Sequence, residues 1–221
     1  MLAVYQTRFL EAALAADALK FGEFTLKSGR HSPYFFNAAA FCNGKLLSVM
    51  TEAYAAVIAE LHETCAIDVL FGPAYKGIPL VAGIAQALFH RYDINLAWAF
   101  NRKETKTHGE GGNIVGASVA GKKVLLVDDV LTAGTAVRQS LALLAQEQAM
   151  PVGLVIALDR QEKVGDSNLS ALKQFSVENQ LQTRAIITLD DLMTFVKESG
   201  KPAVLEKMQA YRKIYGISEA D

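Results

Sequence analysis

Two adjacent aspartates stand between an apolar run and a string of small and hydroxyl-bearing residues. Asp128 and Asp129 follow residues 124–127, VLLV, and precede VLTAGT. If the run is a buried strand and a helix begins near Thr135, the N–H groups of the helix N-terminus form a phosphate cradle, which Gly134 lets the anion approach closely. The carboxylates would then accept hydrogen bonds from the hydroxyls of an attached sugar. A bare acidic pair is more simply an acidic strand end with a threonine N-cap, so the complete string carries this interpretation.

A second turn of this kind lies at residues 71–79, FGPAYKGIP. Its two glycines and Pro73 shape a tight turn after another apolar run, and Pro79 suits the first turn of a helix. Lys76 adds a positive charge where backbone amides could face an anion. The alternative is an ordinary strand–helix turn with a solvated lysine.

Residues 101–113, NRKETKTHGEGGN, form a basic stretch. Its potential cations are Arg102, Lys103, Lys106 and His108. Because the stretch contains glycines and no large apolar residue, it cannot anchor itself in a core, and we expect a mobile loop with neither helix nor strand. Such a loop suits a lid that closes over a pyrophosphate leaving group. A solvated basic surface loop is the alternative.

Aromatic and basic residues gather in two further places. The strings FTLKSGR at 24–30 and SPYFFN at 32–37 predict part of an antiparallel hairpin, whose aromatic faces could clasp a flat anionic ring or simply pack the hairpin. Arg160 follows the apolar run 154–158 and can hold a carboxylate bidentately. Its alternative role is an exposed salt bridge with Asp159 or Glu162.

The elements that must position these residues alternate in type along the chain. Helical patterns cover roughly 2–20, 46–62, 78–90, 135–148, 190–199 and 203–214. Short apolar runs lie between them at 69–71, 97–100, 124–127, 154–158 and 186–187. This alternation predicts an α/β fold with a doubly wound parallel sheet, whose ligands bind beyond the carboxyl ends of the strands. We expect one domain over 1–221, with a small antiparallel hood built mainly from about 21–45 and possibly the C-terminal part. Residues 163–185 show no pattern that we interpret.

Composition excludes several classes of function. The chain of 221 residues is 51% hydrophobic and carries a formal net charge of -1, so no overall basic field favours nucleic acid or an anionic membrane. No apolar stretch approaches the roughly 20 residues of a membrane span. Charged residues near the N-terminus interrupt the apolar run that a signal peptide needs. Cys42 and Cys65 have no metal-ligand spacing. We therefore expect a cytoplasmic protein with no membrane or nucleic-acid partner.

Together these strings resemble the orotate phosphoribosyltransferases, a family of type I phosphoribosyltransferases. The resemblance runs in order and spacing from 24 to 162, through FTLKSGR, YFFN, GPAYKG, NRKE, HGEGG, the Asp128–Thr135 string and LDRQE at 158–162. It implies the type I phosphoribosyltransferase fold and transfer of the phosphoribosyl group of 5-phosphoribosyl 1-pyrophosphate (PRPP) to orotate, giving orotidine 5'-monophosphate and pyrophosphate in UMP biosynthesis. It also implies a Mg²⁺ cofactor held mainly by the substrate, with no direct protein ligand, and a homodimer with shared active sites.

The resemblance further implies roles for individual residues. Those expected to contact PRPP are Lys27, Tyr75, Lys76, Arg102, Lys103, Lys106, His108, Asp128, Asp129, Val130, Leu131, Thr132, Ala133, Gly134, Thr135 and Ala136. Those expected at orotate are Lys27, Phe35, Phe36, Thr132 and Arg160. Lys106, Lys103, His108 and Arg102 are the expected catalytic residues, and Arg102 and Lys106 are expected to act in the partner's site.

Two rival functions stay open on the sequence. The first is an enzyme of the same fold acting on a purine or on uracil, against which the aromatic pair at 35–36 and Arg160 argue, since a neutral base needs no cation. The second is a non-catalytic regulator that senses PRPP and binds nucleic acid. The net charge of -1 and the intact basic stretch 101–113 disfavour that regulator.

Overall fold

A six-stranded sheet forms the centre of the computed structural model, which describes every residue except 27, 107–111, 132–133, 166 and 218–221. The strands are β3 (Val69–Gly72), β4 (Ala97–Lys106), β5 (Gly112–Gly116), β6 (Lys123–Asp128), β7 (Met150–Asp159) and β8 (Gln182–Thr188). They lie in the order β5-β4-β3-β6-β7-β8. All neighbours pair in parallel except β4 and β5, which pair antiparallel. The predicted doubly wound α/β sheet is confirmed, with an antiparallel edge strand added.

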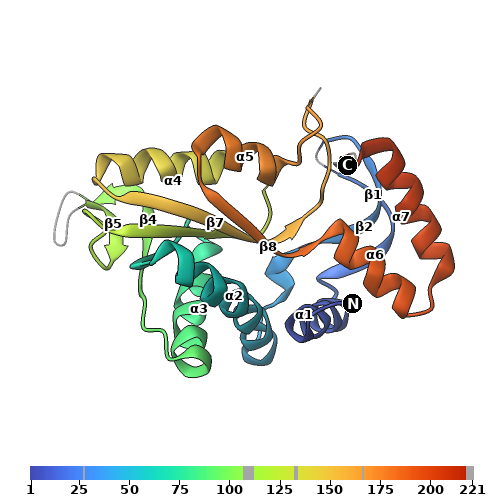
Figure 1. Ribbon diagram of the computed structural model, residues 1–221, viewed down its shortest axis with the longest axis horizontal. Helices are drawn as coiled ribbons and strands as arrows, with labels where there is room; N and C mark the ends of the chain where they lie inside the picture. The colour runs from blue at the N-terminus through green and yellow to red at the C-terminus, as the bar shows by residue number, and fades with distance from the viewer. Residues whose placement is uncertain (27, 107–111, 132–133, 166, 218–221) are drawn as a thin grey trace.

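Helices cover both faces of this sheet. They are α1 (Val4–Ala15), α2 (Gly44–Cys65), α3 (Gly77–Tyr92), α4 (Thr135–Gln146), α5 (Ala171–Asn179), α6 (Leu189–Glu198) and α7 (Pro202–Tyr215), with a 3-10 turn at Ala38–Ala40. Figure 1 shows α4 and α5 over one face, and α2 and α3 over the other. In the part of the chain that the structure describes, no helix is long and apolar enough to cross a membrane.

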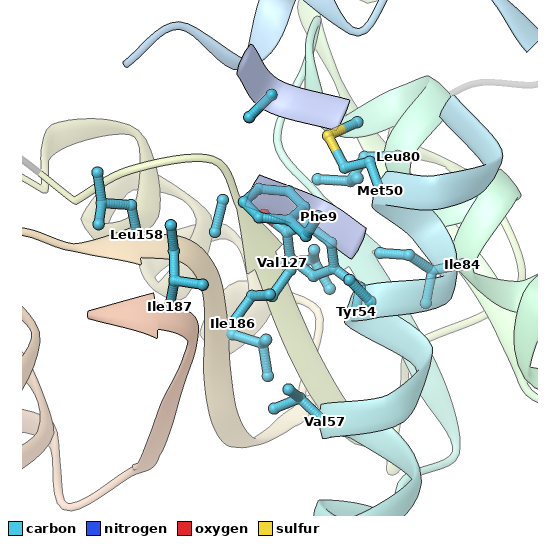
Figure 2. Packing of buried hydrophobic residues seen from close by; sticks show 14 of the residues in the cluster. Phe9, Met50, Tyr54, Val57, Leu80, Ile84, Val127, Leu158, Ile186 and Ile187 are labelled. Atoms are coloured by element: carbon cyan, nitrogen blue, oxygen red, sulfur yellow. The ribbon is translucent and has the colours of Figure 1, made fainter. Parts of the chain in front are cut away.

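Alternate residues of the central strands feed two separate hydrophobic cores. On β6, Leu125 and Val127 join the core beneath α2 and α3, whereas Val124 and Leu126 join the core beneath α4 and α5. Figure 2 shows Val127 in the first core, in the same group as Phe9 of α1. Because successive side chains of a strand point to opposite faces, a strand covered on both faces needs a continuous apolar run.

A two-stranded sheet stands apart from the main one. β1 (Leu19–Thr25) and β2 (His31–Phe36) pair antiparallel, and Figure 1 shows them beside α7. Tyr34 of β2 meets Tyr211 of α7 edge to face, with ring centroids 6.3 Å apart. A hairpin and the C-terminal helix are thus in contact, and their grouping as a hood on a single domain stays a prediction.

Two sequence expectations about elements were wrong, and one segment without an interpretation proved to contain a helix and part of a strand. The helix expected over 2–20 ends at Ala15, because Asp17 turns the chain at a φ of 56° and β1 follows. The stretch expected to lack strands over 101–113 contains the end of β4 and the start of β5, because backbone pairing at a sheet edge needs no apolar side chains. Residues 163–185 hold α5 and the first half of β8, which alternates exposed and half-covered residues as a strand at the sheet edge does.

Candidate active site

The loops after β3 and β6 meet at the carboxyl edge of the sheet. β3 and β6 are neighbours, although the chain visits β4 and β5 between them, so the strand order reverses at this point. Such a switch point leaves a crevice where ligands of open α/β sheets bind. Lys76 Nζ, in the first loop, lies 2.8 Å from Asp129 Oδ2, in the second, across 53 residues of sequence.

The acidic pair is held by bonds to its backbone. Tyr54 of α2 is fully buried and donates its hydroxyl to the Asp128 carbonyl at 2.7 Å, while the Asp129 carbonyl accepts from Ala157 N–H of β7 at 2.9 Å. The Asp129 and Val130 N–H groups bond to the carboxylates of Asp128 and Asp129, at 2.9 and 3.0 Å. Burial, followed by the neighbouring Asp129 charge, raises the pKa of Asp128 to about 6.

The N-terminus of α4 lies where the sequence predicts an anion cradle, and no side chain caps it. Gly134 is the N-cap of α4, has a φ of 69° and supplies no side chain to cap the helix. The N–H groups of the first turn can therefore donate hydrogen bonds to a ligand. Thr135 and Ala136 are exposed there. Leu131 packs its side chain into the core under α4, so only its backbone can face the turn. Thr132 and Ala133 lie outside the described residues.

The loop after β3 is pinned from two directions. Gly72 and Gly77 approach so closely that a Cβ on either one would collide with the backbone of the other. Asn101 of β4 accepts a hydrogen bond from Ala74 N–H at 2.8 Å, just before the cis Ala74–Tyr75 peptide bond. These contacts fix the backbone from which the side chains of Tyr75 and Lys76 extend.

Tyr75 and the basic strand β4 meet beside this loop. The Tyr75 side chain is 67% exposed, and Lys103 Nζ lies 4.7 Å from the centre of its ring. Arg102 is half-buried on the same strand. Only the backbone of 104–106 is described, which includes Lys106, and His108 lies outside the described residues. One of the four predicted cations, Lys103, is thus directly seen next to the loop after β3.

The aromatic residues of the hairpin point in opposite directions. Phe35 is 39% exposed and packs on Phe24, with ring centroids 5.6 Å apart. Phe36 is buried against Phe9 of α1, so its side chain belongs to the core and only its backbone remains for a ligand. Lys27 lies outside the described residues. The side chains of the two phenylalanines therefore cannot both line one pocket in this conformation.

Arg160 lies at the end of β7, one strand away from the acidic pair. Its Nε donates to Glu162 Oε1 at 2.6 Å, and its side chain is only 14% exposed. The salt bridge with Glu162 that was the alternative role is therefore present, but it is largely covered rather than exposed. A cation held in partial burial at the carboxyl edge of the sheet suits a ligand carboxylate.

Sequence reasoning missed three residues that support this site, and it named a fourth, Glu162, only as the partner of an exposed salt bridge. Tyr54 and Asn101 hold the loops after β6 and β3, and Glu162 and Tyr211 contact Arg160. No spacing rule identifies Tyr54 or Tyr211, because each lies on a helix far from the motif it contacts. Asn101 stands inside a string that was noticed, and a search for polar residues flanking the cations would have included it.

Comparisons with known proteins agree with this geometry. Residues 48–186 match the model of the phosphoribosyl transferase domain. The orotate phosphoribosyltransferase of Proteus mirabilis (strain HI4320) is 50% identical over 215 residues, covering 97% of this chain and 99% of that protein. That of Acinetobacter baumannii (strain ACICU) is 49% identical over 209 residues, 95% of each. The chain belongs to the orotate phosphoribosyltransferase family. The crystal structure of orotate phosphoribosyltransferase from Francisella tularensis has a TM-score of 0.84 at 45% identity, covering 94% of this chain and 98% of that one.

Membership in the orotate phosphoribosyltransferase family confirms the predicted resemblance and its fold. Within the described residues, no group of three or more His, Cys, Asp or Glu is placed to hold a metal ion. The carboxylates of Asp128 and Asp129 can nonetheless accept hydrogen bonds from water on a Mg²⁺ ion whose ligands come mainly from substrate phosphates. The residues present therefore fit a magnesium ion that arrives with the substrate.

Proposed function

We propose that this chain transfers the phosphoribosyl group of PRPP to orotate, giving orotidine 5'-monophosphate and pyrophosphate in the synthesis of UMP. The observation that carries the proposal is the convergence of the two loops through Lys76 and Asp129, 2.8 Å apart. This contact supports a site in which an uncapped helix N-terminus, an acidic pair and a cationic loop act together at the carboxyl edge of the sheet. Those are the groups needed for the 5-phosphate, the ribose hydroxyls and the pyrophosphate. The relatives named above carry the same activity in their names.

The proposed reaction is a displacement at the anomeric carbon of ribose. The bond to the pyrophosphate oxygen breaks ahead of attack, and its electron pair leaves with pyrophosphate. A ring nitrogen of orotate bonds to the carbon, and its proton passes to pyrophosphate or to water. The work of the protein is to stabilise the charge that builds on the leaving group. Lys76, Lys103, Lys106 and His108 are the cations proposed for that task. Asp128 and Asp129 would orient the sugar through its hydroxyls.

Mg²⁺ is the proposed cofactor, bound through oxygens of PRPP. When bound, it would neutralise part of the pyrophosphate charge. The carboxylates of Asp128 and Asp129 would accept hydrogen bonds from the ribose hydroxyls or from water on the ion. No direct protein ligand is proposed.

A homodimer with shared sites is part of the proposal. Exposed aromatic side chains on α3 and β4, namely Phe89, Tyr92 and Trp98, support a surface that a second copy would cover. β4 leads directly to the basic stretch, so this surface adjoins the residues that are proposed to act in the partner's site. Cys42 and Cys65 are free thiols, which suits the proposed cytoplasmic location.

The decisive test is the ultraviolet absorbance of orotate on mixing the protein with PRPP and Mg²⁺. We expect the absorbance to change with time and to require both PRPP and the metal. Uracil and hypoxanthine, offered under the same conditions, should not be consumed. Consumption of either in place of orotate would favour the purine or uracil rival, and binding of PRPP with no turnover of any base would favour the regulator.

The raised pKa of Asp128 predicts how PRPP affinity depends on pH. The empty fold holds a proton on this carboxyl below about pH 6, and the proton removes an acceptor for the ribose hydroxyls. We expect affinity to fall as the pH drops through 6, by up to about tenfold per unit. The raised pKa also affects the stability of the protein without ligand. The Asp128 carboxyl stabilises the folded state when the pH is below its ordinary pKa, and this stabilisation is lost as the pH rises through about 6.

Asp128→Asn is the control for this pH dependence. PRPP has phosphate groups whose own second pKa lies near 6, so the substrate contributes a slope in both proteins. The quantity to measure by calorimetry is the difference between wild type and variant from pH 5 to 8. Equal slopes in the two proteins would show that Asp128 does not set the affinity.

A further inference from the structure

A polar network joins the end of β7 to the hairpin and to the C-terminal helix. Glu162 lies at its centre, with a side chain 13% exposed. Its Oε1 accepts from Arg160 Nε at 2.6 Å and from the Tyr211 hydroxyl at 2.6 Å, and its Oε2 accepts from Arg30 Nη1 at 2.8 Å. Both carboxylate oxygens are thus used within the protein.

The Arg160 guanidinium is fixed on three sides by this network. Glu162 holds its Nε edge, the Tyr34 ring lies 4.3 Å from Cζ, and Nη2 donates to Ser32 Oγ at 3.0 Å and to the Tyr211 hydroxyl at 3.3 Å. Among the described residues, Nη1 takes no hydrogen-bond partner. One end of the guanidinium is therefore held in place by the protein while its other nitrogen is left for a ligand.

Tyr211 remains a hydrogen-bond donor throughout the working range of pH. Burial, followed by the hydrogen bond to Glu162, raises the pKa of Tyr211 to about 12. The ring of Tyr211 also packs edge to face on Tyr34 and against Tyr215 one turn further along α7. The position of the hydroxyl is therefore set by the docking of the whole helix.

We propose that Glu162 and Tyr211 are positioning residues, which hold Arg160 in the orientation that binds the carboxylate of the base. The proposal rests on the proposed function, in which Arg160 contacts orotate. It makes the C-terminal helix part of base selection, although that helix lies about one strand and two helices beyond the recognised motifs. A preorganised arginine binds a carboxylate without first losing side-chain freedom, so loosening it costs base affinity.

Tyr211→Phe and Glu162→Gln test the proposal by steady-state kinetics on the full chain. We expect the KM for orotate to rise about threefold in the first and on the order of tenfold in the second, because a misplaced guanidinium loses its hydrogen bonds to the carboxylate. The kcat at saturating orotate and the KM for PRPP should stay within about twofold, since neither depends on Arg160.

Tyr215→Phe is the matched control, because it removes a hydroxyl from the same helix where no described residue bonds to it. Arg160→Ala distinguishes a failure of the positioning role from a failure of the proposed function. If Arg160→Ala raises the orotate KM but both folded test variants leave it unchanged, the positioning role is overturned while the proposed function stands. If Arg160→Ala has no effect, or wild type does not consume orotate, the positioning role falls together with its premise. Tyr211→Phe loses only one oxygen, so it keeps the test decisive if Glu162→Gln fails to fold.

Discussion

Replacing Lys106 by alanine should lower kcat by about 10²- to 10³-fold, by analogy with the loss of one oxyanion donor. The expected cause is the loss of a cation that faces pyrophosphate as negative charge builds on it. The charge is larger in the transition state than in bound PRPP, so the dissociation constant for PRPP should change much less than kcat. Single-turnover mixing, which isolates the chemical step, and calorimetric binding of PRPP provide the two measurements.

Lys122→Ala is the control for this experiment, because Lys122 is exposed and lies before β6, outside every proposed contact. It should leave both quantities unchanged. An unchanged chemical step in Lys106→Ala would contradict the assignment, and a loss of PRPP binding equal to the loss of turnover would make Lys106 a ground-state ligand.

Mixing two inactive variants should restore activity if the sites are shared between subunits. Lys106→Ala removes a cation proposed to act in the partner's site, and the double variant Asp128→Ala/Asp129→Ala removes the sugar acceptors from a subunit's own site. A mixed dimer then contains one site with all three residues and one site with none of them. With random exchange of subunits, about a quarter of wild-type activity is expected, since half of the dimers would each hold one intact site.

The control is each inactive variant diluted with itself, which should show no recovery. Exchange must be verified separately, by mass spectrometry of the mixed dimer. If mixed dimers form and activity stays at the level of the separate variants, Lys106 acts within its own subunit. If sedimentation shows a monomer at assay concentration, the shared site is excluded.

The central strands could be predicted because a strand that is buried on both faces requires a continuous run of apolar residues. β6 and β7 are covered on both faces, so they read as continuous apolar runs, and the helices between them show their own period. β5 and the first half of β8 have no such apolar run, because strands at a sheet edge are partly exposed. They are held by backbone hydrogen bonds, which do not depend on apolar side chains. The failure over 101–113 has the same origin.

Within the site, local groups were predictable and distant pairings were not. The acidic pair, the glycine before α4 and the lysine after β3 lie inside short sequence strings. Neighbouring residues in each string are enough to suggest what the group could bind. Phe35 and Phe36 show the limit, because alternation on a strand says that they face opposite ways without saying which of them meets the core. The roles of all the site residues stay predictions, and Lys27, Thr132 and His108 also lie outside the described residues.

By itself, the sequence determined the class of fold, the edge of the sheet where chemistry is proposed and the residues that could cradle a sugar phosphate. Each of those follows from neighbours in the chain, through backbone geometry and local burial. Only the tertiary structure decided that Lys76 meets Asp129, that Tyr54 bonds to the Asp128 carbonyl and that α7 reaches Arg160. Such contacts depend on the order of strands and the docking of helices, which is a property of how the whole chain packs.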